Sequence, residues 1–147
     1  MKQKGPLYIH GPVHIFNPIP EFDILIKDLH EEPVIPTSSD IDPKLNLEGL
    51  KRVADIFIFQ KNRNPYDPEY QVDDFKGSII TLVVDIPDSI RKEFVPSTLK
   101  LLYYDKHKKL WVAFADEDVR ILNSVAVVSL KSWIKDPPLG WGGDHPH

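Results

Sequence analysis

The chain has 147 residues, of which 41% are hydrophobic and 27% charged, a composition typical of one globular domain with a sizeable core. Its net charge of −4 gives no long-range attraction for phosphate backbones or anionic lipid, so we expect no nucleic acid and no membrane partner. The sequence has no cysteine, which excludes disulfides, thiolate metal sites and cysteine nucleophiles.

The sequence also predicts a cytoplasmic protein, because no apolar run approaches the ~18 residues of a membrane span and the first residues lack the apolar stretch of a signal peptide. Fourteen prolines against seven glycines predict short elements joined by stiff loops. Together with the absence of cysteine and a single methionine, they favour a thermostable protein.

The first half of the chain gives three strand signals and one helix signal. Residues 7–16 are β-prone and interrupted at Gly11-Pro12, 22–29 alternate between apolar and polar, and 53–60 are apolar on both faces. Residues 43–54 predict a helix capped by Asp42, with Pro43 in its first turn. The segments 31–44 and 61–77 are polar and proline-broken, which indicates long loops.

In the second half, residues 78–86 again have apolar residues on both faces and predict a strand that is covered on both sides. A short helix over 88–94 would be capped by Asp88 and stopped by Pro96. Residues 98–104 and 110–114 predict a hairpin, and 119–122 and 125–130 a second one that turns at Asn123-Ser124.

These signals predict an all-β fold, an antiparallel β-sandwich of about seven to eight strands with one or two short helices and long proline-rich loops. Residues 1–136 would form a single sandwich domain. Residues 137–147 would form a tail rich in Gly, Trp and His that packs on the domain or on a partner.

The run from Ser97 to Val112 contains a Tyr-rich strand, a short charged loop and then Leu110-Trp111-Val112. This run resembles a hairpin of immunoglobulin-like β-sandwich modules, including those of microbial surface proteins, ankyrins and netrin receptors. The resemblance covers about twenty residues. It implies a sandwich in which the tryptophan packs in or beside the core, and it carries no functional residue across.

Three histidines suggest a metal site. His10 and His14 are four residues apart and would share a face of one continuous strand, where His145 of the tail could join them around zinc. The alternative is that Gly11-Pro12 bends the strand and separates the two rings.

Three acidic clusters suggest calcium, because carboxylates of neighbouring loops can meet around this ion. They are Asp40 with Asp42, then Asp67, Glu69, Asp73 and Asp74, and lastly Asp116-Glu117-Asp118. None has the spacing of a calcium loop, so solvated turns are the alternative. The sequence also has no nucleophile elbow, phosphate loop or dinucleotide fingerprint. We therefore expect no resident cofactor.

The tail has two tryptophans, Trp133 and Trp141, and the second lies between glycines that allow close backbone approach. Both are candidate partner-binding residues, either by capping the edge of the chain's own sheet or by docking on another subunit. The leading prediction is a non-enzymatic binding or assembly module with a protein partner or self-association. One alternative is a carbohydrate- or peptide-binding sandwich with exposed tryptophans, and another is a metal-dependent enzyme using His10 and His14.

Overall fold

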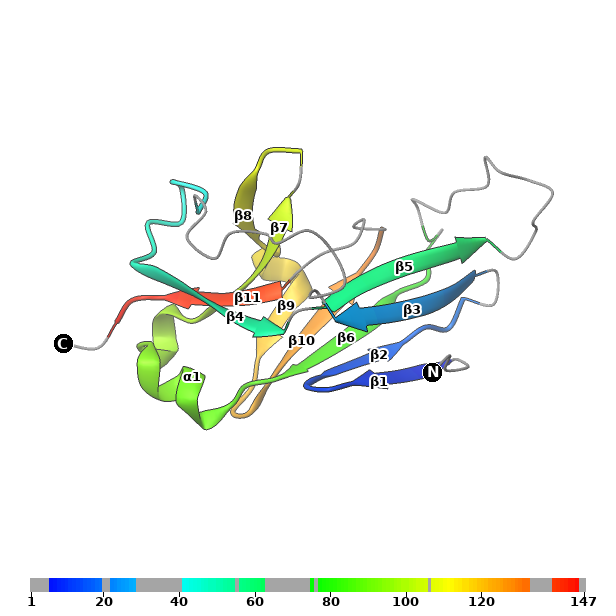
Figure 1. Cartoon of the computed structure of the whole chain (residues 1–147), viewed down its shortest axis with the longest axis horizontal. Coiled ribbons are helices and arrows are strands. Elements are labelled where there is room, and N and C mark those ends of the chain that lie inside the picture. Colours follow the sequence, from blue (N-terminus) through cyan, green and yellow to red (C-terminus); the bar gives the residue numbers. More distant parts are fainter. Residues whose placement is uncertain are drawn as a thin grey trace.

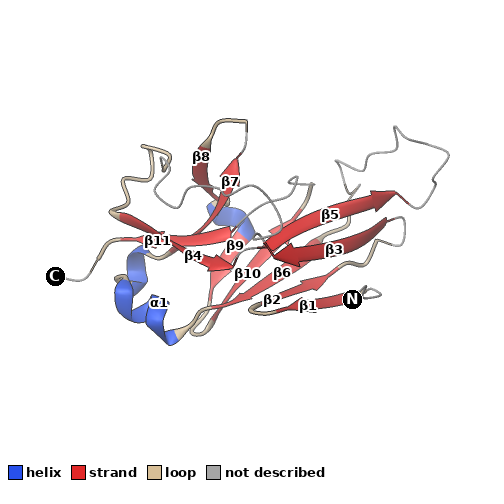
Figure 2. Ribbon diagram, viewed as in Figure 1, coloured by secondary structure: helices blue, strands red, loops and turns tan. Residues whose placement is uncertain are grey.

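The computed structural model describes most of the chain, namely residues 6–19, 22–28, 41–54, 56–62, 75, 77–105, 107–132 and 139–145. Strands dominate these residues, and the short α1 (Asp88–Glu93) lies at one end of the molecule (Figure 1, Figure 2). Two single-turn helices follow it along the chain, η2 (Pro96–Thr98) and η3 (Asp116–Asp118).

The first sheet has five antiparallel strands in the order β1-β2-β6-β10-β9. Its strands are β1 (Leu7–His10), β2 (Val13–Phe16), β6 (Ile80–Asp85), β10 (Val125–Leu130) and β9 (Val119–Ile121). The predicted hairpin that turns at Asn123-Ser124 is confirmed, because β9 and β10 pair with each other. The interruption at Gly11-Pro12 is a turn, and β1 and β2 form a hairpin around it.

The second sheet has four antiparallel strands in the order β4-β11-β7-β8. They are β4 (Gly49–Ala54), β11 (Leu139–Gly143), β7 (Lys100–Asp105) and β8 (Leu110–Ala113). The predicted hairpin around the charged loop is confirmed as β7 and β8. A separate two-stranded ribbon consists of β3 (Phe22–Asp28) and β5 (Ile56–Asn62).

The main core lies between the two large sheets, as in a β-sandwich, so the predicted fold class is confirmed. The first sheet contributes alternate residues of its strands, which is the pattern of a sheet with one buried face. From this sheet the core receives Tyr8, Val13, Ile15, Ile80, Leu82, Val84, Ala126, Val128 and Leu130. The second sheet contributes Leu101, Leu139 and Trp141, and α1 contributes Ile90.

Two of the helix predictions need correction. Residues 43–54 do not form a helix, because Asp42 closes a single turn by accepting from the N–H of Leu45, and Asn46 then takes a positive φ of 50°. The chain continues as β4, which pairs with β11. In α1 the N-cap is Pro87, and Asp88 is the first helical residue, where its carboxylate pairs with Arg91.

Candidate functional site

The tryptophan of the second hairpin strand is core, as the hairpin pattern predicts. Trp111 is fully buried on the side of the second sheet that faces away from the main core, where it packs on Leu102. The ring of Tyr104, its cross-strand partner, meets it edge-on at 5.5 Å between centroids. The turn after Ile41 covers the ring, and the N–H of Asp42 donates to the Trp111 carbonyl at 2.9 Å. Trp111 is therefore no exposed platform for a sugar.

The segment expected to be a separate tail is a strand of the sandwich. Strand β11 lies between β4 and β7, in the interior of the second sheet, so it does not cap a sheet edge. Its glycines leave room for side chains on the outer side. A Cβ at Gly140 would lie 3.2 Å from the Trp111 ring, and one at Gly142 would lie 2.9 Å from Leu102.

This placement corrects the expectation for Trp141. Its side chain is fully buried in the main core of its own chain, so it offers no surface to a partner. Trp133 lies outside the described residues. The hypothesis of a sandwich with exposed tryptophans therefore has no support from Trp111 or Trp141.

The end of β11 is fastened to η2 by hydrogen bonds in both directions. The N–H of Asp144 donates to the hydroxyl of Thr98 at 2.9 Å, and the N–H of Val95 donates to the Asp144 carbonyl at 2.7 Å. Next to it, the imidazole of His145 packs on Phe94 at 5.3 Å between ring centroids. These contacts fix the position of α1 and η2 against the second sheet.

The three candidate metal ligands do not meet. In the β1–β2 hairpin His10 pairs with Val13, whereas His14 pairs with Ile9. Directly paired residues share a face, and Val13 is buried while Ile9 is exposed, so the two imidazoles lie on opposite faces. His145 packs instead on Phe94. The assumption of one continuous strand was wrong because the hairpin turn changes the register.

The acidic clusters likewise do not converge where the structure describes them. Asp116 lies 3.3 Å from Lys100, and Asp118 lies 3.1 Å from Lys131, so two of the three carboxylates of this cluster pair with lysines. The partner of Asp42 in the first cluster and the whole second cluster lie outside the described residues. Within the described part of the chain, no group of three His, Asp or Glu side chains could hold a metal ion.

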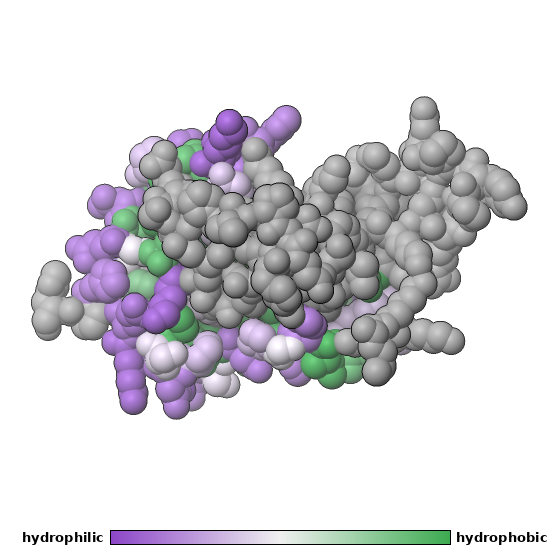
Figure 3. Space-filling model, viewed as in Figure 1, coloured by the Kyte–Doolittle hydropathy of each residue, from purple (hydrophilic) through white to green (hydrophobic). Residues whose placement is uncertain are grey.

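The outer face of the first sheet carries several apolar residues. It consists of the residues that alternate with the core positions, and it runs across all five strands through their registers. Its members are Leu7, Ile9, His14, Phe16, Thr81, Val83, Asp85, Arg120, Val125, Val127 and Ser129. Leu7, Ile9 and Phe16 are 52%, 46% and 47% exposed. Figure 3 shows hydrophobic surface gathered at the lower edge of the view, over β1 and β2.

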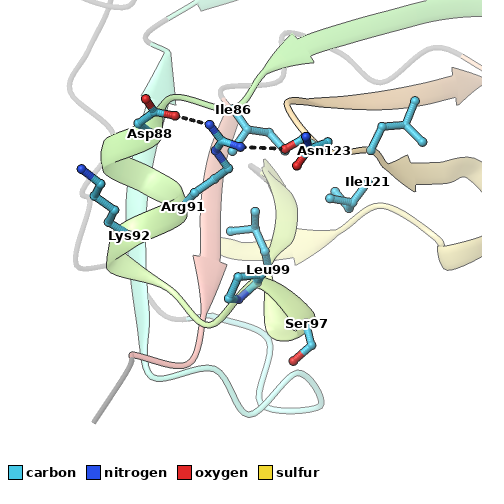
Figure 4. Close-up of a pocket in the computed structure, with 10 residues that line it drawn as sticks. Ile86, Asp88, Arg91, Lys92, Ser97, Leu99, Ile121 and Asn123 are labelled. Atoms are coloured by element: carbon cyan, nitrogen blue, oxygen red, sulfur yellow. Dashed lines mark hydrogen bonds and ion pairs between the residues drawn. The ribbon is translucent and has the colours of Figure 1, made fainter.

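A groove lies beside the other edge of the same sheet, between α1 and η2 on one side and the end of β9 on the other (Figure 4). It consists of two adjoining cavities of about 640 and 300 Å³, which share Pro96, Ser97, Leu99 and Ile121. We call this the β9 groove.

One side chain ties the two walls of the β9 groove together. The guanidinium of Arg91 on α1 pairs with Asp88 and donates to the carbonyl of Asn123 at 3.1 Å, in the turn between β9 and β10. Arg91 therefore links the helix to the β9–β10 turn across one end of the groove.

Comparison with known proteins gives no relative: no family model, no curated protein and no solved structure matches the chain. Among the described residues, no helix has the length and hydrophobicity needed to cross a membrane.

Proposed function

We propose that the chain is a non-enzymatic assembly module that associates with a second copy of itself through the outer face of its five-stranded sheet. The observation that carries this proposal is the exposed apolar group of Leu7, Ile9 and Phe16 on β1 and β2. The half-buried Val83 and Val127 lie on the same face, across His14 from Ile9. An antiparallel sheet with one face in solvent normally carries polar residues on that face. Contiguous exposed apolar surface of this kind is typical of protein interfaces.

The sequence of β6 gives independent support. Its apolar residues on both faces predict a strand that is covered on both sides. The main core covers Ile80, Leu82 and Val84, whereas Ile79 remains 43% exposed and Val83 is half-buried. A second molecule on the outer face would supply the missing cover, because two sheets pack face to face about 10 Å apart.

Charge favours a second copy as the occupant. The outer face carries one acidic and one basic residue, Asp85 and Arg120, and is therefore neutral, although the chain as a whole has a net charge of −4. Because the face is neutral, two copies that pack through it do not repel each other electrostatically. A face built for an oppositely charged partner would show a surplus of one sign.

The exposed-tryptophan alternative has no support from the buried Trp111 and Trp141. The metal-dependent alternative has lost its geometric basis, since His10 and His14 lie on opposite faces.

The proposal is tested by measuring molar mass with light scattering over a range of protein concentrations. We expect twice the chain mass of 16.9 kDa for the unmodified protein. The Phe16→Lys variant places a charge on the outer face and should be a monomer, whereas Phe16→Leu should remain a dimer as a matched control. A monomer at every concentration, or equal masses for both variants, would contradict the proposal.

A further inference from the structure

The last strand of the first sheet has backbone groups that point away from the sheet. Strand β9 pairs with β10, and in the described chain no strand lies beyond it. Just past β9, the N–H of Leu122 donates to the carbonyl of Val125 at 2.8 Å. Hydrogen-bonded and non-hydrogen-bonded pairs alternate in an antiparallel ladder, so Ile121, which pairs with Ala126, directs its N–H and C=O away from β10.

These groups lie where the β9 groove begins. Ile121 borders both of its cavities, and its side chain is 40% exposed. The floor includes the buried side chains of Ile86 and Leu99. An exposed strand edge next to a channel with an apolar floor is the arrangement used for adding a peptide strand, since the edge supplies main-chain hydrogen bonds and the channel accepts side chains.

The charges along the β9 groove restrict the peptide. Its lining has three basic residues, Arg91, Lys92 and Lys100, and two acidic ones. Both acidic residues are paired, Asp88 with Arg91 and Asp116 with Lys100. The lining therefore has a net charge of 3 − 2 = +1, in a chain of net charge −4. A neutral or acidic segment matches this lining better than a basic one.

We infer that the β9 groove is a peptide-binding site, in which a neutral or acidic segment adds to β9 as an extended strand and places an apolar side chain over Leu99 and Ile121. The N–H and C=O of Ile121 make the main-chain hydrogen bonds. Asp88 and Arg91 close one end of the site, and Lys100 with Asp116 border the other. This site is separate from the proposed self-association surface and does not depend on it.

The test begins with selection of short random peptides displayed on phage, with the full chain as bait. Selected peptides are then titrated into the protein by calorimetry. We expect alternating apolar residues and a neutral or negative charge among the selected sequences.

Two substitutions interrupt the site in different ways. Ile121→Pro removes the outward N–H and leaves the ladder with β10 intact, because that N–H does not face β10. It should weaken binding about five- to tenfold, the equivalent of one hydrogen bond and some apolar contact, whereas Ile121→Val should change it less than about twofold. Ser97→Trp fills the groove from the exposed η2 and should abolish binding, with Ser97→Ala as its control.

Circular dichroism confirms that each variant is folded, and light scattering should show an unchanged molar mass for all four. Failure to enrich any peptide overturns the inference, and so does equal binding by Ile121→Pro or Ser97→Trp. Neither result bears on self-association, which the mass of the Phe16→Lys variant decides separately.

Discussion

Replacing Trp111 by alanine tests how the second sheet is held together. The indole is fully buried between Leu102, the ring of Tyr104 and the backbone of Gly140. Truncating a large buried aromatic costs about 3–5 kcal/mol, because burial is lost and a cavity remains. For a chain of this size about 1 kcal/mol lowers the melting temperature by about 2–4 °C, so we expect a decrease of about 6–20 °C.

The decrease is measured by calorimetry or by circular dichroism during heating. Tyr104→Ala serves as a comparison. Because the Tyr104 ring is only half-buried, its removal should lower the free energy of unfolding by less than the removal of the Trp111 ring. A melting temperature unchanged by Trp111→Ala would refute the packing described for the outer side of the second sheet. It would also support the alternative hypothesis that Trp111 is an exposed platform for a ligand.

Four further changes test other features of the molecule. Gly142→Ala should lower the free energy of unfolding by about 1–3 kcal/mol, because the added methyl group overpacks against Leu102 and Leu47. Equal free energies of unfolding for the variant and the unmodified protein, measured by chemical denaturation, would contradict the close packing over β11. Truncation after Asp136 removes an interior strand and should abolish cooperative thermal unfolding, so an unchanged melt would contradict the place of β11. Zinc should change the melting temperature of neither the unmodified protein nor His10→Ala, and a zinc-induced rise that the variant loses would show that His10 binds the ion. Burial, and then the nearby Asp105 carboxylate, raise the pKa of Tyr103 above its ordinary value of 10.0. The unfolded chain therefore loses this proton first, and stability should fall as the pH rises above about 10. In Tyr103→Phe the free energy of unfolding, measured by denaturant titration, should fall less steeply with pH than in the unmodified protein. The same pH dependence in both proteins would contradict this prediction.

The strands and hairpins were predictable from local signals. Alternation and turn residues identified the β7–β8 and β9–β10 hairpins, whose partners are close in sequence. The apparent helix over 43–54 rested on Asp42 as its cap and Pro43 in its first turn. Pairing of β4 with the distant β11 overrode this local preference.

Strand β11 gave no strand signal of its own. Three of its five residues are glycines, which are depleted in strands. For Gly140 and Gly142 the reason appears only in the folded structure, where Trp111 and Leu102 occupy the space that a Cβ atom would need. Non-local packing of this kind leaves no periodic trace in a short segment, and for this reason Trp141 suggested an anchor that docks on the chain's own sheet or on a partner, rather than a residue of an interior strand.

The candidate surfaces were only partly visible in the sequence. Apolar residues on both faces of β6 indicated that something covers its outer side. The β9 groove had no such signal, because it arises where α1 and the β9–β10 turn are tied together by Arg91 and Asn123, residues 32 positions apart.

Self-association through the outer face of the first sheet is most directly tested by locating the contact in solution. Methyl-labelled, deuterated protein is mixed with unlabelled protein, and magnetisation transferred from the unlabelled copy is recorded at each methyl group. We expect transfer to Leu7, Ile9, Val83 and Val127, which lie on that face, and none to the core methyls of Leu82 and Val128 on β6 and β10. Transfer confined to Leu45 and Leu47, beside Trp111 on the second sheet, would contradict it.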